Sequence, residues 1–286
     1  MRRHTRIVIQ GYPGSYHHEA AREYFGARHI ECIPARSFEI LGQTLREDQG
    51  CNYAVMAIEN SIAGSILQNY RILRENEFWI SGEVYLRVSH QLLGLPGQTI
   101  QDIRTVESHP MAIYQCYDFL NQHKHIGVVE SADTALSAQR VAEQGLSAVA
   151  AIASRLAAKE YGLEILASDI ETSKANYTRF FIISREAQYA SLGNANKASI
   201  YLRVPHQHGS LLKVLQVISD DNINLSKLQS FPVTGELNNY YFHLDLEFEH
   251  ISQYENCIDQ LKSLTTGLEE LGVYTKAAIY DHQHVK

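Results

Sequence analysis

Polar side chains stand directly after several apolar segments of the sequence, and their types suit the binding of an oxygen-rich anion. Glu59, Asn60 and Ser61 follow the apolar run 53–58, and Gly64 comes shortly after them. A carboxylate, a carboxamide and a hydroxyl in succession offer several hydrogen bonds to one ligand. The alternative for this segment is a helix start capped by Asn60 or Ser61. Three polar residue types at the end of one predicted strand favour a binding site.

The loop GYPGS at residues 11–15 follows the apolar run 6–10 and precedes a helical pattern. Ser15 is predicted to cap that helix, and the small residues before it leave backbone N–H groups open to an anion. An ordinary strand-to-helix turn explains the loop equally well. The inner face of the helix is predicted to carry Ala20, Ala21, Tyr24 and Phe25.

Ser108 and Ser131 also follow predicted extended segments. Pro110 favours the first turn of a helix, so either Ser108 or His109 is predicted to cap it. Gln115 lies about two turns along this helix from Ser108 and is able to face the same cleft. Each feature by itself is also typical of an ordinary strand-to-helix connection.

Thr178 and Arg179 stand at the start of the apolar run 180–183, which predicts a buried strand. A threonine at the start of such a strand is usually a β-forming residue whose hydroxyl bonds the backbone. The local pattern alone therefore favours a structural role for Thr178.

The composition limits the class of protein. The chain has 286 residues, 45% of them apolar, which is enough for about two domains. A net charge of −7 argues against a general nucleic-acid surface. The four cysteines are scattered without zinc-type spacing, so we expect reduced thiols in a cytoplasmic protein. The first residues lack the pattern of a signal peptide, and no apolar stretch approaches the roughly 20 residues of a membrane span, so we expect no membrane role.

The sequence contains no metal-ligand cluster, no P-loop and no G-x-G-x-x-G dinucleotide motif. We therefore expect a site built from hydroxyls, amides and helix termini. A reaction of an oxygen-rich anion that needs no cofactor and no metal suits such a site.

Residues 5–185 alternate short apolar runs with helical patterns, which predicts an α/β fold with a mainly parallel sheet. Ligands of such sheets bind beyond the carboxyl ends of the strands, where the polar residues stand. The segment 186–197 is polar and shows no periodicity, which is typical of a linker. Residues 198–281 follow the order strand, helix, strand, strand, helix, strand, the ferredoxin-like βαββαβ motif.

Taken in order, these segments resemble the prephenate dehydratase family with its C-terminal ACT regulatory domain, from about residue 5 to residue 280. The most specific mark is the triplet Thr178-Arg179-Phe180, preceded by Asn176. In the second domain, GSLL at residues 209–212 stands where the family has a Gly-Ala-Leu-Leu type motif. INLSKLQSFP at 223–232 stands where it has Ile-Asn-Leu-x-x-Ile-Glu-Ser-Arg-Pro.

The resemblance implies a catalytic domain of two α/β lobes, similar to periplasmic binding proteins, with the active site in the cleft between them. It implies conversion of prephenate to phenylpyruvate, with loss of CO2 and water and without a cofactor, in L-phenylalanine biosynthesis. It also implies inhibition by L-phenylalanine at the interface of paired ACT domains, in a homodimer or homotetramer. The alternatives are an arogenate dehydratase, whose substrate carries an amino group in place of the keto group, and an amino-acid sensor without catalysis.

Carried over by position, Thr178 matches the essential residue that gives a proton or a hydrogen bond to the leaving hydroxyl. Asn60, Gln115 and Ser108 match positions that bind or polarise the substrate, and Glu59 matches one that supports them. The further substrate-binding residues expected are Ser15, Ser61, Gly64, Ser131, Arg179 and Phe180. The expected L-phenylalanine site comprises Gly209, Ser210, Leu211, Leu212, Asn224, Leu225 and Ser230.

Two roles stay open in the triplet, and several positions depart from the family pattern. Arg179 either pairs with a carboxylate or is a structural ion-pair partner, and Phe180 is expected to wall the substrate ring. Met111 replaces the glutamine common after His-Pro, and Gly-Tyr-Pro-Gly at residues 11–14 replaces the usual Gly-Pro-x-Gly. In the ACT motif Gln229 replaces Glu and Phe231 replaces Arg, which removes a charge from the expected effector site.

Overall fold

The computed structural model describes residues 4–27, 30–187, 194–233, 235–236 and 238–280. These residues form two compact units. The first unit comprises the described residues within 1–76, 84–181 and 278–286, and the second those within 77–83 and 182–277. Of the predicted linker 186–197, residues 188–193 lie outside the described part, as does residue 281. The domain boundaries expected from the sequence therefore stay predictions.

Most of a seven-stranded sheet, built mainly from apolar segments, belongs to the first unit. Its order is β16 (Ile279–Tyr280), β5 (Trp79–Arg87), β11 (Tyr177–Ser184), β3 (Tyr53–Asn60), β1 (Thr5–Gln10) and β2 (Ile30–Ala35), with β4 (Gly64–Ser65) paired to β3. β1 runs parallel to both β2 and β3. Helices that pack on these strands are α1 (Tyr16–Phe25), α2 (Phe38–Glu47) and α3 (Leu67–Glu75). Residues 54–58 are all buried, as expected for a strand covered on both faces.

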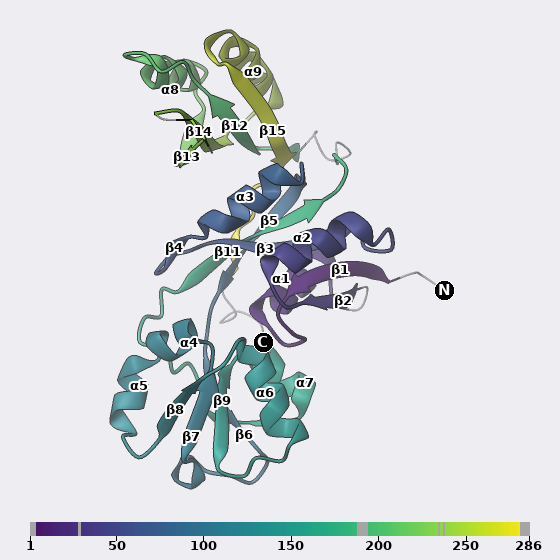
Figure 1. Ribbon diagram of the computed structural model, residues 1–286, viewed down its shortest axis with the longest axis vertical. Coiled ribbons are helices and arrows are strands. Elements are labelled where there is room, and N and C mark those ends of the chain that lie inside the picture. Colours follow the sequence, from purple (N-terminus) through teal and green to yellow (C-terminus); the bar gives the residue numbers. More distant parts are fainter. Residues whose placement is uncertain (1–3, 28–29, 188–193, 234, 237, 281–286) are drawn as a thin grey trace. The chain divides into compact units, whose positions relative to one another are not determined.

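A five-stranded sheet forms the other lobe of the first unit. Its order is β10 (Glu164–Ala167), β6 (Gln91–Gly94), β9 (Val149–Ala153), β7 (Thr105–Ser108) and β8 (Gly127–Glu130). Around it lie α4 (Pro110–Gln115), α5 (Tyr117–Gln122), α6 (Thr134–Glu143) and α7 (Arg155–Tyr161) (Figure 1). The short 3-10 helix η1 (Ile100–Asp102) precedes β7. Because β7 runs parallel to β8 and β9, the carboxyl ends of these three strands lie at one edge of the sheet.

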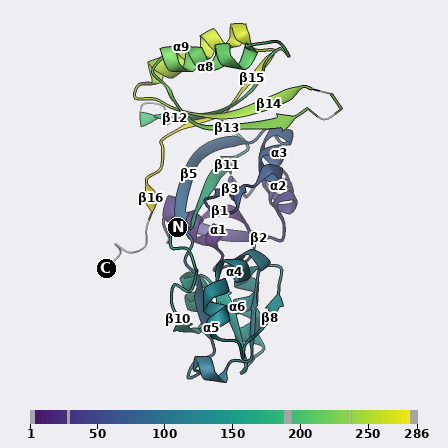
Figure 2. The same ribbon diagram turned by 90° about the vertical axis from the view of Figure 1, so that its left-hand side faces the viewer.

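The second unit contains the predicted βαββαβ order. The elements are β12 (Lys197–Arg203), α8 (Ser210–Asp220), β13 (Asn224–Pro232), β14 (Tyr240–Glu247), α9 (Ile251–Leu264) and β15 (Gly267–Tyr274). They form an antiparallel sheet of order β13-β14-β12-β15, and α8 and α9 cover one of its faces (Figure 2). The ferredoxin-like fold expected from the sequence is confirmed, as is the mixed α/β fold with two sheets before it.

Two local predictions differ from the structure. The helix after Ser15 buries Ala20 and Ala21, but Tyr24 is 43% exposed because it lies in the last turn, and His17 takes the buried place one turn earlier. The alternative considered for residues 59–61, a helix start capped by Asn60 or Ser61, is not found. Residues 61–63 form a turn before β4, and α3 begins only at Leu67, without a side-chain cap.

Candidate active site

Asn60, the last residue of β3, has a side chain whose orientation is fixed by the backbone of the following turn. Its Oδ1 accepts hydrogen bonds from the backbone N–H groups of Ile62, at 3.0 Å, and Ala63, at 2.9 Å. A backbone N–H can only donate, so the amide nitrogen of Asn60 must point the other way. That nitrogen donates to Asn176 Oδ1 at 2.7 Å and to Thr178 Oγ1 at 2.9 Å.

Asn176 connects this cluster to the second lobe. It is fully buried, and because its oxygen accepts from Asn60, its amide nitrogen donates to Gln115 Oε1 at 3.0 Å. Gln115 is the last residue of α4 and is 8% exposed. Its own amide nitrogen has no acceptor among the described residues. Side chains from β3, β11, α4 and the segment before β11 therefore meet in one hydrogen-bonded cluster.

Thr178 lies at the start of β11 with its hydroxyl oxygen already bonded. It is 8% exposed, and its Oγ1 accepts from Asn60. An oxygen that accepts this bond keeps its own proton for another partner. No acceptor for that proton lies within hydrogen-bonding distance in the described chain. Thr178 and Gln115 thus each present an unused donor at the surface of the cluster.

Ser61 joins the end of β3 to the start of β11. Its hydroxyl donates to the carbonyl of Ala175 at 2.9 Å and accepts from the backbone N–H of Tyr177, also at 2.9 Å. Its own N–H donates to the Tyr177 carbonyl at 2.8 Å. Glu59 and Gly64 lie in the adjoining β3–β4 pairing, and Gly64 has a φ of 81°, a conformation that favours glycine. These contacts set the place of Thr178.

Three predicted serines lie outside this cluster. Ser108 is fully buried and donates to the carbonyl of Ile152 at 2.6 Å, which joins β7 to β9. Ser131 contacts the hydroxyl of Ser137 at 2.5 Å, and Ser15 caps α1 by accepting from the backbone N–H of residue 18. These contacts fit structural roles for the three side chains better than direct contact with a ligand.

Arg179 and Phe180 belong to the core of the first sheet. The Arg179 guanidinium, in a side chain only 3% exposed, lies 4.6 Å from the centre of the Phe181 ring and 5.7 Å from that of Tyr85. Successive side chains of a strand point to opposite faces, so Arg179 points away from the face of Thr178. Phe180 is 1% exposed and packs edge-on against His17, 5.0 Å away. The expectation that it walls a substrate ring is not supported.

His90 and Tyr16 extend the cluster, although neither was predicted to be a site residue. His90 Nε2 lies 2.9 Å from Gln115 Oε1, and His90 Nδ1 lies 2.8 Å from the Tyr16 hydroxyl. Burial lowers the pKa of His90 and raises the pKa of Tyr16 well above its ordinary value. Both side chains are therefore neutral near pH 7. The sequence offered no signal for His90, since it stands beside an apolar strand and no motif includes it.

A buried ion pair holds the segment that leads to Asn176. Arg87 Nη2 lies 3.2 Å from Glu171 Oε1, with side chains 7% and 0% exposed. Glu171 Oε2 also accepts from the backbone N–H of His90 at 3.0 Å, and Arg87 Nε donates to the Lys174 carbonyl at 3.1 Å. The backbone N–H of Val88 donates to the Asn176 carbonyl at 2.7 Å. These bonds fix the segment before β11 against the end of β5.

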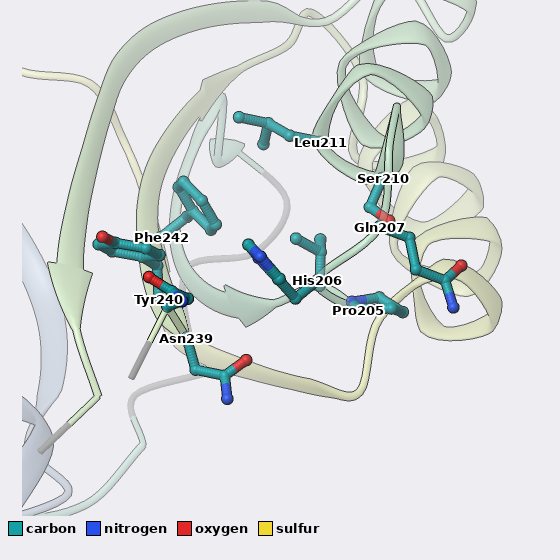
Figure 3. A pocket seen from close by; sticks show the side chains of 10 residues that line it. Pro205, His206, Gln207, Ser210, Leu211, Asn239, Tyr240 and Phe242 are labelled. Atoms are coloured by element: carbon teal, nitrogen blue, oxygen red, sulfur yellow. The ribbon is translucent and has the colours of Figure 1, made fainter. Parts of the chain in front are cut away.

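The second unit contains a pocket of about 170 Å³ between the start of α8 and the start of β14 (Figure 3). Of the predicted effector residues, Ser210 and Leu211 line it. Gly209 is the N-cap residue before α8 and has a φ of 77°, while Leu212 is 67% exposed and does not line the pocket. The other three predicted residues lie on β13, outside the pocket. The lining residues that were not predicted are Val204, Pro205, His206, Gln207, Asn238, Asn239, Tyr240 and Phe242.

The described residues contain no group of three or more His, Cys, Asp or Glu side chains that is able to hold a metal ion. None of their helices is both long and apolar enough to cross a membrane.

Comparisons with known proteins agree across the chain. The family model described as "Prephenate dehydratase" matches residues 7–188. "Arogenate dehydratase/prephenate dehydratase 1, chloroplastic" of Arabidopsis thaliana is 37% identical over 287 residues, which cover 94% of this chain and 72% of that protein. "Bifunctional chorismate mutase/prephenate dehydratase" of Escherichia coli (strain K12) is 31% identical over 275 residues, which cover 94% of this chain and 70% of that protein.

Solved structures give the same result for the fold. Prephenate dehydratase from Arthrobacter aurescens in complex with L-Phe has a TM-score of 0.83 and 26% identity, over 97% of this chain and 94% of that one. A structure described as "GqqA- a novel type of quorum quenching acylases" has a TM-score of 0.85 and 33% identity, over 95% of this chain and 98% of that one.

Proposed function

The chain belongs to the prephenate dehydratase family of hydro-lyases, and we propose that it converts prephenate to phenylpyruvate in L-phenylalanine biosynthesis. The observation that carries the proposal is the pair of unused donors, the Thr178 hydroxyl and the Gln115 amide nitrogen, on one hydrogen-bonded cluster. The substrate is a dianion with a hydroxyl that must leave. A site that presents two hydrogen-bond donors suits such a substrate.

The reaction needs little from the protein beyond position and one proton. The electron pair of the breaking bond to CO2 enters the ring and completes its aromatic system as the carbon–oxygen bond to the C4 hydroxyl breaks. The leaving oxygen takes a proton and departs as water. Thr178 directs its proton outward because its oxygen accepts from Asn60. It thereby gives a hydrogen bond that strengthens as negative charge grows on the leaving oxygen, while Gln115 binds another oxygen of the substrate.

The test is turnover of prephenate by the purified protein, followed as phenylpyruvate. Thr178→Val keeps the shape of the side chain and removes the proton, so we expect kcat to fall by about 100-fold or more, the loss typical of one transition-state donor. Thr178→Ser keeps the hydroxyl and serves as the matched control, with a much smaller loss. Absence of turnover by the unaltered protein would refute the function. Equal activity of the valine and serine variants would refute the role of Thr178.

Arogenate is the alternative substrate, because several relatives carry the name arogenate dehydratase. Prephenate and arogenate differ in one keto or amino group, so their kcat/KM values, measured side by side, identify the preferred substrate. Tight binding of either compound without turnover would favour the third candidate, a sensor without catalysis.

We further propose that the second unit is an ACT domain that binds L-phenylalanine and inhibits the enzyme. The L-Phe complex of the Arthrobacter aurescens protein supports this proposal, as does a pocket that joins apolar Phe242 and Leu211 to polar Gln207 and Asn239. A homodimer or homotetramer formed through ACT and catalytic domains is part of the same proposal, to be measured by light scattering. None of the four cysteines, all of which the structure describes, forms a disulfide, which is compatible with the proposed cytoplasmic location.

A further inference from the structure

The positions of Tyr16 and His90 determine which atoms in the active-site cluster carry protons. His90 is 2% exposed, and its ring meets that of Tyr16 edge to face, with centres 5.5 Å apart. One imidazole nitrogen contacts the Tyr16 hydroxyl and the other contacts the Gln115 side-chain oxygen. A neutral imidazole has a single proton, so only one of these nitrogens donates.

The direction of each bond follows from the backbone donors of the turn after β3. Those N–H groups fix the oxygen of Asn60, so its nitrogen donates to Asn176. Asn176 then donates its own nitrogen to Gln115 Oε1. The same Gln115 oxygen lies 2.9 Å from His90 Nε2. Since an oxygen cannot donate there, Nε2 of His90 must carry the proton.

Tyr16 completes the assignment at the other nitrogen. With the proton on Nε2, His90 Nδ1 is an acceptor, and the Tyr16 hydroxyl is the donor 2.8 Å away. That hydroxyl also donates to the Ser89 carbonyl, 2.9 Å away, which accepts from the Gln91 side-chain nitrogen at 3.3 Å as well. The single Tyr16 proton is therefore shared between His90 Nδ1 and this carbonyl.

We propose that His90 is a positioning residue, held by Tyr16 in the tautomer protonated at Nε2, which keeps the Gln115 oxygen turned inward and its amide nitrogen directed at the substrate. The proposal rests on the proposed function for the substrate contact of Gln115, but the tautomer itself does not depend on it. If the proton moved to Nδ1, two lone pairs would face each other between His90 and Gln115. A rotated Gln115 amide would then point its nitrogen at the donor nitrogen of Asn176.

Two variants of matched chemistry test the role of His90. In His90→Gln the amide nitrogen reaches the position of the imidazole Nε2, whereas in His90→Asn it reaches only that of Nδ1. We expect kcat to fall about tenfold further in His90→Asn than in His90→Gln, the effect of one lost hydrogen bond to a site residue. Thermal unfolding of both variants separates this loss from loss of fold. Equal kcat values in two folded variants would overturn the proposal.

Tyr16→Phe tests how the tautomer is held. In the unaltered protein this change frees His90 to take the other tautomer, so we expect kcat to fall about threefold or more. In the His90→Gln background no tautomer remains to be fixed, so the same change is expected to have little effect. An equal loss in both backgrounds would overturn the role of Tyr16.

The 15N chemical shifts of the His90 ring provide a readout that needs no turnover. The resonances are identified by their absence from His90→Gln, and we expect a protonated Nε2 and an unprotonated Nδ1 at pH 7. A protonated Nδ1 would refute the assignment. If the protein lacks activity on prephenate but shows the expected shifts, the proposed function fails while the tautomer stands.

Discussion

Asn60 donates a hydrogen bond to the Thr178 hydroxyl oxygen, so the Thr178 hydroxyl keeps its own proton for another acceptor. The Asn60 oxygen is held by two backbone N–H groups and the Asn60 nitrogen by two side-chain oxygens. A threonine hydroxyl is a weak acid, so its direction matters more than its acidity. The backbone N–H groups of the turn after β3 fix the orientation of the Asn60 amide, and the Asn60 amide in turn fixes the direction of the Thr178 hydroxyl.

His17 gives the protein a pH dependence of stability at the level of one residue. Its Nε2 accepts from the backbone N–H of Ala57 at 3.2 Å, and burial lowers its pKa from 6.5 to about 3. Below pH 6.5 the unfolded chain binds a proton at this residue that the folded chain does not. As the pH is lowered from 6.5 to about 3, the free energy of unfolding therefore falls by about 1.4 kcal/mol for each pH unit.

Urea unfolding at pH 7 and pH 5 measures this contribution. His17→Gln removes the titration and keeps an acceptor for Ala57, so we expect its loss of stability between the two pH values to be about 2 kcal/mol smaller than that of the unaltered protein. Other buried histidines contribute equally to both proteins. An identical loss in the two proteins would show that His17 does not titrate in this way.

The sequence led to Asn60, Gln115 and Thr178 because a family motif marks each of them. The motif did not distinguish these residues from Arg179 and Phe180, which belong to the core of the sheet. A motif does not indicate toward which face of a strand a side chain points. The period of two in β11 decides that question only once the sheet is known. His90 acts through Gln115, 25 positions away, and such a relation leaves no local pattern.

At the level of elements, β5 carries two buried ion pairs. Glu83 lies 3.0 Å from Lys197 of β12, with side chains 0% and 1% exposed, and four residues later Arg87 pairs with Glu171. Glu83 also accepts from the backbone N–H of Ala277 at 3.3 Å. This strand was not among the predicted ones. Its polar residues interrupt the apolar run and find their partners only in distant parts of the sequence.

Lys197→Met is the variant that tests the first pair. It leaves the Glu83 carboxylate buried without its lysine, so we expect the free energy of unfolding to fall by about 3 to 5 kcal/mol. Urea unfolding measures the change. Lys262→Met is the matched control, because Lys262 pairs with Asp259 at the exposed surface of α9, and its loss should change stability little. Equal effects of the two changes would contradict a stabilising role for the buried pair.

For the whole molecule, regulation requires that the pocket of the second unit affect a reaction in the first. Leu211→Trp is designed to fill the pocket, and Gln216→Trp places the same ring at an exposed position further along α8. We expect the first variant to need at least about tenfold more L-phenylalanine for half-inhibition, since a filled pocket loses most contacts with a ligand. The second should match the unaltered protein. Loss of inhibition in both variants would point to the helix rather than the pocket.

The sequence predicts the order of elements in the second unit, but it does not predict every residue that belongs to that unit. The βαββαβ order of the second unit follows from periodicity because its elements are consecutive. The membership of residues 77–83 in that unit does not follow from periodicity. It depends on contacts such as that between Gly272 and Ile80, where a Cβ added to Gly272 would clash with the carbonyl oxygen of Ile80. Such a close contact requires a residue without a side chain, and a glycine in the sequence does not say which segment it contacts.

The division of β5 between the two units also sets an order of events during synthesis. Residues 77–83 leave the ribosome about 100 residues before the segment from residue 182 onward with which they form the second unit. At roughly 5 to 20 residues per second, the first half of β5 waits about 5 to 20 seconds for its partners. During that interval the nascent chain exposes a strand that contains Trp79 and Ile80, both buried in the finished protein. We expect chaperones that recognise apolar segments to bind this strand during that interval.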